Sequence, residues 1–450
     1  MPSSPVGPRH LSWLVVAVAA LSQLVVNRRV GGPLVFADEL GYIAAARYFA
    51  PGQPNIQMLS AFYHFGYGLV LAPLVVLFGE PGSFYRAATV FNSVLAVGST
   101  VVFHRVVLLR HLGVSPVPAA AGALAFALTP SLLVNTSIVW AETILVAIVV
   151  LLLALLLRTF ERNGMIDGVL VGAAGAFAYG SHPRAIVLTF AVAGVLAVGG
   201  VFRRLSPAVS VAGIGTAALG LFGARAVNDA MAEALYTDGS ILESADVVTG
   251  LISESPSQWL AGLGGTAWYQ LLATAGLGFF GLLWLVRHLP TWSRRELGGA
   301  QVVSLFLISA LGVSWLVGAV ISVGADPRID QLYYGRYLDI FAPSLSAFGV
   351  VWLVQRQRTG WQLPVAIAGC LLAGGWLISL RGDDAFFADG VVVQVNVPVA
   401  NSIEQLTGSW DPAVIGVVGA ISAAVALAVF RWRMVAGVAL VCLFFAAMAE

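Results

Sequence analysis

The chain has 450 residues, of which 59% are hydrophobic and 10% charged, whereas a soluble domain carries about 25% charged residues. This composition excludes a soluble enzyme and predicts an all-α protein that crosses the membrane many times. The formal net charge of +1 excludes the strongly basic surface that binding to nucleic acid requires.

Long apolar runs predict about thirteen spans, because a membrane-spanning helix needs about 20 mostly apolar residues. The predicted spans are 10–30, 84–108, 117–134, 137–157, 165–181, 184–202, 206–225, 266–288, 301–323, 338–354, 362–380, 413–430 and 434–449. No segment has the composition of a soluble domain, so residues 1–450 are predicted to form one membrane domain. Cys370 and Cys442 both lie within apolar runs, which is typical of packing residues.

Two shorter helices are predicted along the membrane surface between the first two spans. The first begins at Asp38 and ends before Pro51, and the second covers 62–79. Arginine placement supports an interfacial 62–79, because most of the 23 basic residues, all of them arginine, then fall in short cytoplasmic loops or at span ends. A spanning 62–79 would reverse that bias. The long loops 31–83, 226–265, 324–337 and 381–412 are therefore predicted to face outside the cytoplasm.

Asp38 and Glu39 are adjacent carboxylates at the point where the first span leaves the membrane. Asp38 could serve only as the N-cap of the short helix, with Glu39 favourable beside the positive helix end. The alternative is that the two carboxylates carry out chemistry at the membrane surface.

Glu142 lies just inside the predicted span 137–157. A carboxylate at the centre of an apolar helix costs roughly 2.5–3.5 kcal/mol on insertion scales, so Glu142 should face a cavity, a partner or an ion. The alternative is a carboxylate that only starts the helix, near Thr136 or Ser137.

Two basic motifs also fall on the outer side of the predicted topology. In His182-Pro183-Arg184 the guanidinium suits a phosphate or carboxylate, or it simply reaches the interface. In the segment from Asp326 to Asp339, which enters span 338–354, Arg336 lies among tyrosines that include Tyr334. That segment could clamp an anionic headgroup or form an aromatic belt.

The order and sidedness of these groups resemble the GT-C glycosyltransferases, the multi-span enzymes that take sugars from polyprenyl phosphates. The resemblance covers about residues 10–205 well and 206–450 only loosely, and the chain lacks a large C-terminal soluble domain. It also has His64-Phe-Gly-Tyr where many relatives have a proline-containing segment. The motifs that carry the resemblance are Asp38-Glu39, Phe84-Tyr85-Arg86, Glu142 and His182-Pro183-Arg184.

The resemblance implies the GT-C fold and an inverting transfer of a sugar to an acceptor hydroxyl. It implies that Asp38 is the catalytic base, with Glu39 beside it. Glu142 would position the acceptor, or it would join Asp38 in holding a divalent metal such as Mg²⁺, Mn²⁺ or Ca²⁺ through oxygen ligands.

The remaining candidates would serve the donor phosphate. Arg184 and Arg336 would bind it, with Tyr334 beside Arg336 and with His182 assisting. His64 is a further candidate, whose role the departure from the family pattern leaves open.

The expected partners are a polyprenyl-phosphate sugar, membrane lipids and a glycolipid, polysaccharide or peptide acceptor. The protein is expected in the inner membrane of a bacterium, with its site facing outside and a role in building the cell envelope. The main alternative is a transporter or flippase of a polyprenyl-linked lipid, which should carry polar residues near the midplane and in both halves. A second alternative is a non-enzymatic partner of a cell-wall complex, against which the intact Asp38, Glu142 and Arg184 argue.

Overall fold

The computed structural model describes residues 9–28, 30–33, 37–58, 63–236, 256–290, 297–321, 329–356, 362–381 and 393–432. Within these ranges every regular element is a helix, and the only β-pairing is an isolated bridge between Met58 and Tyr236. The predicted all-α membrane fold class is confirmed.

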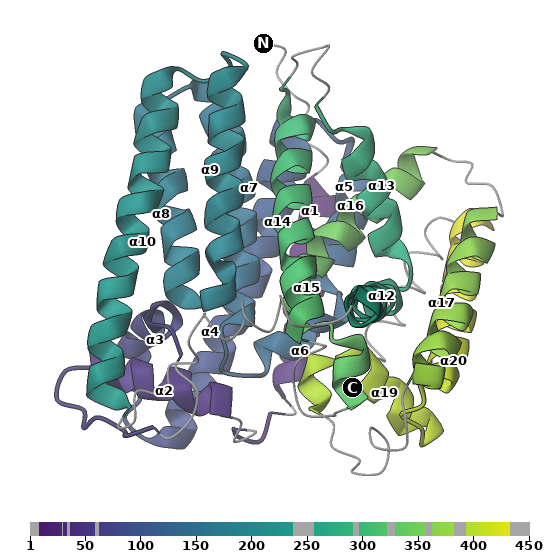
Figure 1. Cartoon of the computed structure of the whole chain (residues 1–450), viewed down its shortest axis with the longest axis horizontal. Helices are drawn as coiled ribbons and strands as arrows, with labels where there is room; N and C mark the ends of the chain where they lie inside the picture. Colours follow the sequence, from purple (N-terminus) through teal and green to yellow (C-terminus); the bar gives the residue numbers. More distant parts are fainter. Residues whose placement is uncertain are drawn as a thin grey trace.

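The helices of the first half are α1 (Arg9–Asn27), α2 (Ala37–Phe49), α3 (Phe65–Leu77), α4 (Pro81–Val102), the π-helix η1 (Phe103–His111), α5 (Pro116–Ala127), α6 (Pro130–Thr136), α7 (Glu142–Arg162), α8 (Met165–Ser181), η2 (Pro183–Ala185), α9 (Ile186–Val201) and α10 (Pro207–Leu235). Those of the second half are α12 (Pro256–Ala273), α13 (Leu277–Arg287), α14 (Gly299–Ile321), η3 (Ile329–Tyr333), α15 (Arg336–Asp339), α16 (Ala342–Arg356), α17 (Gln362–Arg381), η4 (Gln394–Asn396), α19 (Pro398–Thr407) and α20 (Pro412–Trp432). In the first half α7 packs against α4, α8 and α9, and α14 of the second half also contacts it (Figure 1).

Seven helices in the described ranges are long and apolar enough to cross a membrane, and up to ten spans result if each bent pair counts as one. The helices α8 and α16 coincide with the predicted spans 165–181 and 338–354 but are shorter than the usual span. The predicted span 434–449 lies outside the described residues. The structure therefore supports a multi-pass protein, while the predicted number of thirteen spans is not confirmed.

The helices α2 and α3 have 13 residues each. At a rise of 1.5 Å per residue each is about 20 Å long, whereas the hydrocarbon core is about 30 Å thick. They pack against each other at the lower end of the bundle in Figure 1. Gly68 makes this close approach feasible, because a Cβ there would lie 2.9 Å from the backbone carbon of Ala45. These are the two short helices predicted after the first span.

The predicted span 266–288 is wrong as a single helix. It is broken between α12 and α13, whose axes differ by 107°. Ala275 and Gly276 have φ angles of 47° and 79°, and this left-handed backbone ends a helix. The predicted span 117–134 is also bent, by 50°, where Pro130 starts α6 without a backbone N–H to continue α5.

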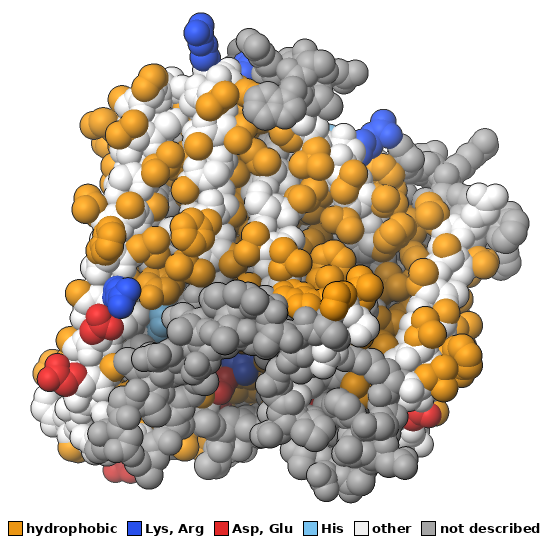
Figure 2. Space-filling view, in the orientation of Figure 1, with side chains coloured by type: hydrophobic (Ala, Val, Ile, Leu, Met, Phe, Trp, Pro, Cys, Tyr) orange, Lys and Arg blue, Asp and Glu red, His pale blue; other side chains and the backbone are white. Residues whose placement is uncertain are grey.

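The upright helices present an apolar surface to their surroundings. Figure 2 shows hydrophobic side chains along their sides, with arginine side chains at the upper end. Inside, one cluster of buried apolar residues extends from Ala19 to Leu427. The short helices α2, α3, α6, α15 and α19 gather at the lower end (Figure 1), so loops that are far apart in sequence meet there.

Candidate active site

Four charged side chains from four different segments meet at the lower end of the bundle. Arg184 and Arg336 both donate to Oε1 of Glu142, the latter through Nε at 2.5 Å. Arg336 also pairs through Nη2 with Oδ2 of Asp38. Arg336 therefore bridges the two carboxylates. The structure brings together the acidic residues Asp38 and Glu142 and the two arginines that the sequence suggested.

The position of Glu142 follows from its place as the first residue of α7. The turn before it is held by Thr143, whose hydroxyl donates to the carbonyl of Asn135 at 2.8 Å. The Glu142 side chain is completely buried, and a buried carboxylate is tolerated only when it is paired. The two guanidinium groups supply that compensation. The sequence suggested a role in acceptor positioning for Glu142, whereas its contacts in the structure are to the arginines.

Arg184 is held in place by its own motif. Nδ1 of His182 accepts the backbone N–H of Arg184 at 3.2 Å, which caps the short helix η2. The guanidinium stacks over the ring of Tyr337 at 4.3 Å. Its Nε and Nη1 atoms are buried and have no hydrogen-bond partner among the described residues. Two N–H groups of this guanidinium, on different edges, are therefore available to the oxygens of an anion.

Arg336 stacks over the indole of Trp140 at 4.3 Å. Its neighbour Tyr334 is buried and packs edge-on against Tyr337, with ring centroids 5.3 Å apart. Tyr337, rather than the predicted Tyr334, contacts an arginine of the site. Sequence reasoning missed Tyr337 and Trp140 as site residues, although they lie one residue after Arg336 and two residues before Glu142.

Asp38 lies in the first turn of α2 and its carboxylate is partly accessible. Burial raises its pKa, but Arg336, the hydrogen bond from Tyr63 and the more distant Arg184 together outweigh burial. The pKa of Asp38 therefore lies below its ordinary value, and the carboxylate is ionised at neutral pH. Tyr63 donates to Oδ1 at 2.7 Å and was not identified from the sequence.

Glu39 is completely buried. Its Oε1 accepts the hydroxyl of Tyr85 at 2.6 Å and the backbone N–H of Val139 at 3.0 Å. These bonds tie α2 to α4 and to the turn before α7. The contacts indicate that Glu39 anchors the site, while the catalytic role suggested by the sequence stays a prediction.

We expect Tyr85→Phe to destabilise the protein by about 1–3 kcal/mol, because a buried carboxylate loses a charge-assisted partner. The change would be measured as a lower melting temperature in detergent. Tyr67→Phe is the matched control, since its hydroxyl bonds the neutral amide of Asn92 at 2.8 Å, and it should cost less. Equal melting temperatures for Tyr85→Phe and the unchanged protein would contradict the anchoring role.

The two predicted histidines are neutral. Nδ1 of His64 lies 2.7 Å from the carbonyl of Tyr179, and burial lowers the pKa of His64 to about 4. Burial, with the nearby Arg184 and Arg336, holds the pKa of His182 well below its ordinary value. Because Nδ1 of His182 accepts a backbone N–H, its proton is on Nε2.

The suggested metal ligands Asp38 and Glu142 are both paired with an arginine in this arrangement. The guanidinium of Arg336 pairs with both Asp38 and Glu142, so a positive charge already lies between the carboxylates. The described part of the chain holds no group of three or more His, Cys, Asp or Glu side chains suited to a metal. Metal dependence stays a prediction from the sequence, and no step proposed below uses a metal.

Solved structures share this architecture. ArnT from Cupriavidus metallidurans in the apo state matches 97% of this chain and 75% of its own, with a TM-score of 0.54 and 18% identity. The same protein bound to undecaprenyl phosphate matches 97% of this chain and 76% of its own, with a TM-score of 0.50 and 16% identity. Arabinosyltransferase EmbB from Mycobacterium smegmatis matches 100% of this chain, with a TM-score of 0.51 and 14% identity, and this chain spans 42% of EmbB.

The chain has the GT-C fold. No family model matches it, and no curated protein matches its sequence. The fold predicted from the short motifs is therefore confirmed by structural similarity alone.

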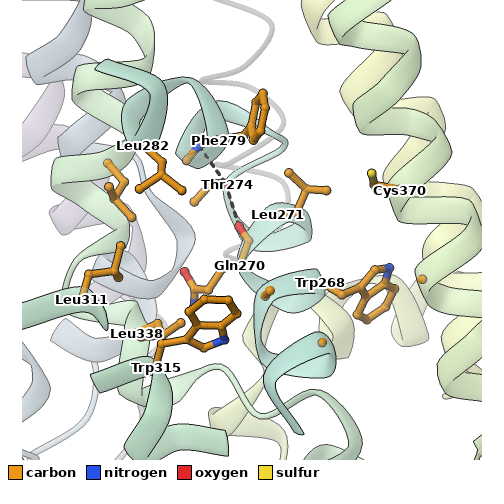
Figure 3. Close-up of a pocket in the computed structure, with 15 residues that line it drawn as sticks. Trp268, Gln270, Leu271, Thr274, Phe279, Leu282, Leu311, Trp315, Leu338 and Cys370 are labelled. Atoms are coloured by element: carbon orange, nitrogen blue, oxygen red, sulfur yellow. Dashed lines mark hydrogen bonds between the residues drawn. The ribbon is translucent and has the colours of Figure 1, made fainter. Parts of the chain in front are cut away.

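Beside the charged groups, the GT-C fold of this chain contains an apolar pocket of about 410 Å³ (Figure 3). The pocket lies at the bend between α12 and α13 and is also lined by residues of α14, α15, α16 and α17. Its side chains include Trp268, Leu271, Phe279, Leu282, Leu311, Trp315 and Leu338.

The pocket is connected to the charged groups through Gln270, which lines it. Nε2 of Gln270 donates to Oδ1 of Asp339 at 2.8 Å and to the carbonyl of Gly335 at 3.1 Å. Gly335 directly precedes Arg336. Arg336 of the charged site is therefore close in sequence to Leu338, which lines the apolar pocket. A lipid with an anionic headgroup needs a cationic group near an apolar pocket.

Proposed function

We propose that this protein is an inverting glycosyltransferase that moves a sugar from a polyprenyl phosphate to an acceptor hydroxyl at the extracytoplasmic face of the membrane. The observation that carries the proposal is a pair of unpartnered N–H groups on Arg184. Nε and Nη1 of this side chain are buried, cationic and without a partner among the described residues, and Glu142 and Arg336 link Arg184 to the ionised Asp38. The GT-C fold and the binding of undecaprenyl phosphate by ArnT add support.

The donor phosphate would bind at Arg184 and Arg336. Arg184 offers the N–H groups of Nε and Nη1, each of which could donate to a phosphate oxygen. Arg336 is already paired with Asp38 and Glu142, so it would contribute mainly its positive charge. The prenyl chain would lie in the apolar pocket, because burying its surface there stabilises the bound lipid.

In the proposed reaction Asp38 accepts the proton of the acceptor hydroxyl. The acceptor oxygen forms a bond to the anomeric carbon while the bond from that carbon to the phosphate oxygen breaks. The phosphate leaves with the electron pair, and the two arginines stabilise its growing charge. A single displacement inverts the configuration at the anomeric carbon, through a transition state with oxocarbenium character.

Arginine placement supports the outward orientation. At the upper end in Figure 1, Arg162 is the last residue of α7, and Arg203 and Arg204 lie in the loop after α9. Such residues are retained on the cytoplasmic side of bacterial membranes. The charged site at the lower end would then face outside, where a glycolipid, polysaccharide or peptide acceptor is available.

Reaction products test the transfer itself. Purified protein in lipid nanodiscs would be incubated with polyprenyl-phosphate mannose or arabinose and a crude envelope extract as acceptor, and released polyprenyl phosphate would be measured by mass spectrometry. Lipids from cells that lack the gene should accumulate an unused sugar donor. If neither change occurs, while the purified protein remains folded, the proposal is wrong.

We expect polyprenyl phosphate to protect Cys370 from alkylation. Cys370 is exposed and lines the pocket, so a prenyl chain bound there would cover its thiol. Maleimide labelling of a Cys442→Ser variant, in which Cys370 is the remaining thiol, should slow about tenfold in the presence of decaprenyl phosphate. Inorganic phosphate should not slow it, and unchanged labelling with the lipid would contradict the assignment of the pocket.

A further inference from the structure

Both oxygens of the Asp38 carboxylate are held by side chains from other parts of the chain. Tyr63, in the connection between α2 and α3, donates its hydroxyl to Oδ1 at 2.7 Å. Arg336, at the start of α15, pairs with Oδ2. Rotation of the carboxylate about its Cβ–Cγ bond would break both contacts, so the plane of the carboxylate is fixed.

The ring of Tyr63 is itself held on several sides. It packs edge-on against the ring of Tyr42, with centroids 5.4 Å apart. It lies directly over Gly41, where an added Cβ would be 2.6 Å from the Cγ atom of Tyr63. The backbone N–H of Tyr63 donates to the hydroxyl of Tyr236, after the end of α10, at 3.3 Å.

The same connection is joined to α10 at an earlier point. The backbone N–H of Met58 donates to the carbonyl of Leu235 at 2.8 Å, and Phe65 donates its N–H to the side chain of Asn228 at 3.0 Å. These bonds flank Tyr63 on both sides in the sequence. The position of its hydroxyl therefore depends on α10, which supplies none of the four charged groups, as well as on α2.

We propose that Tyr63 is a positioning residue whose hydroxyl holds the Asp38 carboxylate in the orientation that receives the acceptor proton. The role of Asp38 as the base rests on the proposed function. The contact between Tyr63 and Asp38 rests on the structure alone. A misaligned base is costly, because proton transfer requires the carboxylate within hydrogen-bond reach of the hydroxyl. The half-buried Tyr63 and the partly accessible Asp38 lie where an acceptor can approach.

The neighbouring pair Tyr85–Glu39 supplies a matched control. It has the same chemistry, a phenol donating to a carboxylate, at 2.6 Å. Glu39, however, is completely buried and also accepts the N–H of Val139. Tyr85→Phe thus removes the same hydroxyl beside the adjacent carboxylate.

The contact is tested by infrared difference spectroscopy of the full chain in nanodiscs at a fixed pH of 7, with Asp38→Asn used to identify the Asp38 carboxylate band. Tyr63→Phe should shift that band, because the carboxylate loses a hydrogen bond, and Tyr85→Phe should leave it in place. An Asp38 band that is identical in Tyr63→Phe and the unchanged protein overturns the contact. This measurement needs no substrate, so it is independent of the proposed function.

The positioning role is tested by kinetics. Tyr63→Phe should lower kcat about tenfold, the loss of one hydrogen bond in the transition state, while the Kd for decaprenyl phosphate stays within about twofold. Site-specific 3-fluorotyrosine at position 63, which keeps both the ring and the hydroxyl, should restore kcat and also covers the case in which Tyr63→Phe fails to fold. An unchanged kcat, or a loss that 3-fluorotyrosine does not restore, overturns the positioning role. Absence of transfer by the unchanged protein would instead overturn the proposed function.

Discussion

Asp38→Asn should reduce sugar transfer by at least a hundredfold while the donor lipid still binds. The amide keeps the size of the side chain, but it cannot accept the proton of the acceptor hydroxyl. Loss of a positioned general base typically costs 10²–10⁴-fold in rate. The measurement is the release of polyprenyl phosphate by the purified variant, together with its affinity for decaprenyl phosphate.

Glu39→Gln is the matched control for this prediction, because it changes the adjacent carboxylate in the same way. Glu39 bonds Tyr85 and Val139, so its replacement should lower the melting temperature more than the rate per folded molecule. Transfer by Asp38→Asn within about tenfold of the unchanged protein would contradict the role of base. A complete loss of transfer in a stable Glu39→Gln variant would move that role to Glu39.

Glu142→Gln should destabilise the protein by about 3–5 kcal/mol, the usual cost of removing one partner from a buried ion pair. Two guanidinium groups share Oε1 of Glu142, and the side chain of Arg184 is only 8% exposed. Without the carboxylate Arg184 would keep a buried charge with no paired anion. A large decrease in melting temperature in detergent, with loss of transfer, is the expected result.

An exposed ion pair supplies the control for Glu142→Gln. Arg225 and Asp229 pair at 3.8 Å with side chains 75% and 64% exposed, so Asp229→Asn should cost less than about 1 kcal/mol. Removing both charges in Glu142→Gln with Arg184→Gln should destabilise less than the sum of the two single changes. Additive losses, or a Glu142→Gln variant as stable as Asp229→Asn, would show that Glu142 does not compensate the arginines.

Several site residues could be found from the sequence, because a charged side chain in an apolar chain is costly unless it has a partner or faces a cavity. Glu142, just inside a predicted span, and Arg184, on the side with few arginines, could both be identified for this reason. Tyr63, Trp140 and Tyr337 could not be found in the same way. Aromatic residues near membrane interfaces are common, and each of these three contacts a charge carried by a distant segment.

The partner of each charged group could not be predicted from the sequence either. Glu142 was assigned to the acceptor or to a metal, yet its contacts are Arg184 and Arg336, the latter 194 positions away. Asp38 and Glu39 are adjacent and chemically alike, yet successive residues of a helix point in directions about 100° apart. One therefore faces the arginines and the other faces Tyr85.

The sequence by itself determined that this is a helical membrane protein with two short surface helices after the first span. That much is local, because twenty consecutive apolar residues have few stable alternatives to crossing a membrane. Only the tertiary structure decided that the run 266–288 breaks at Ala275 and Gly276 to form the apolar pocket, and that four separate segments bring Asp38, Glu142 and the two arginines together. Those outcomes depend on packing between distant helices, which selects one backbone bend and one set of charge partners from many that the local sequence allows.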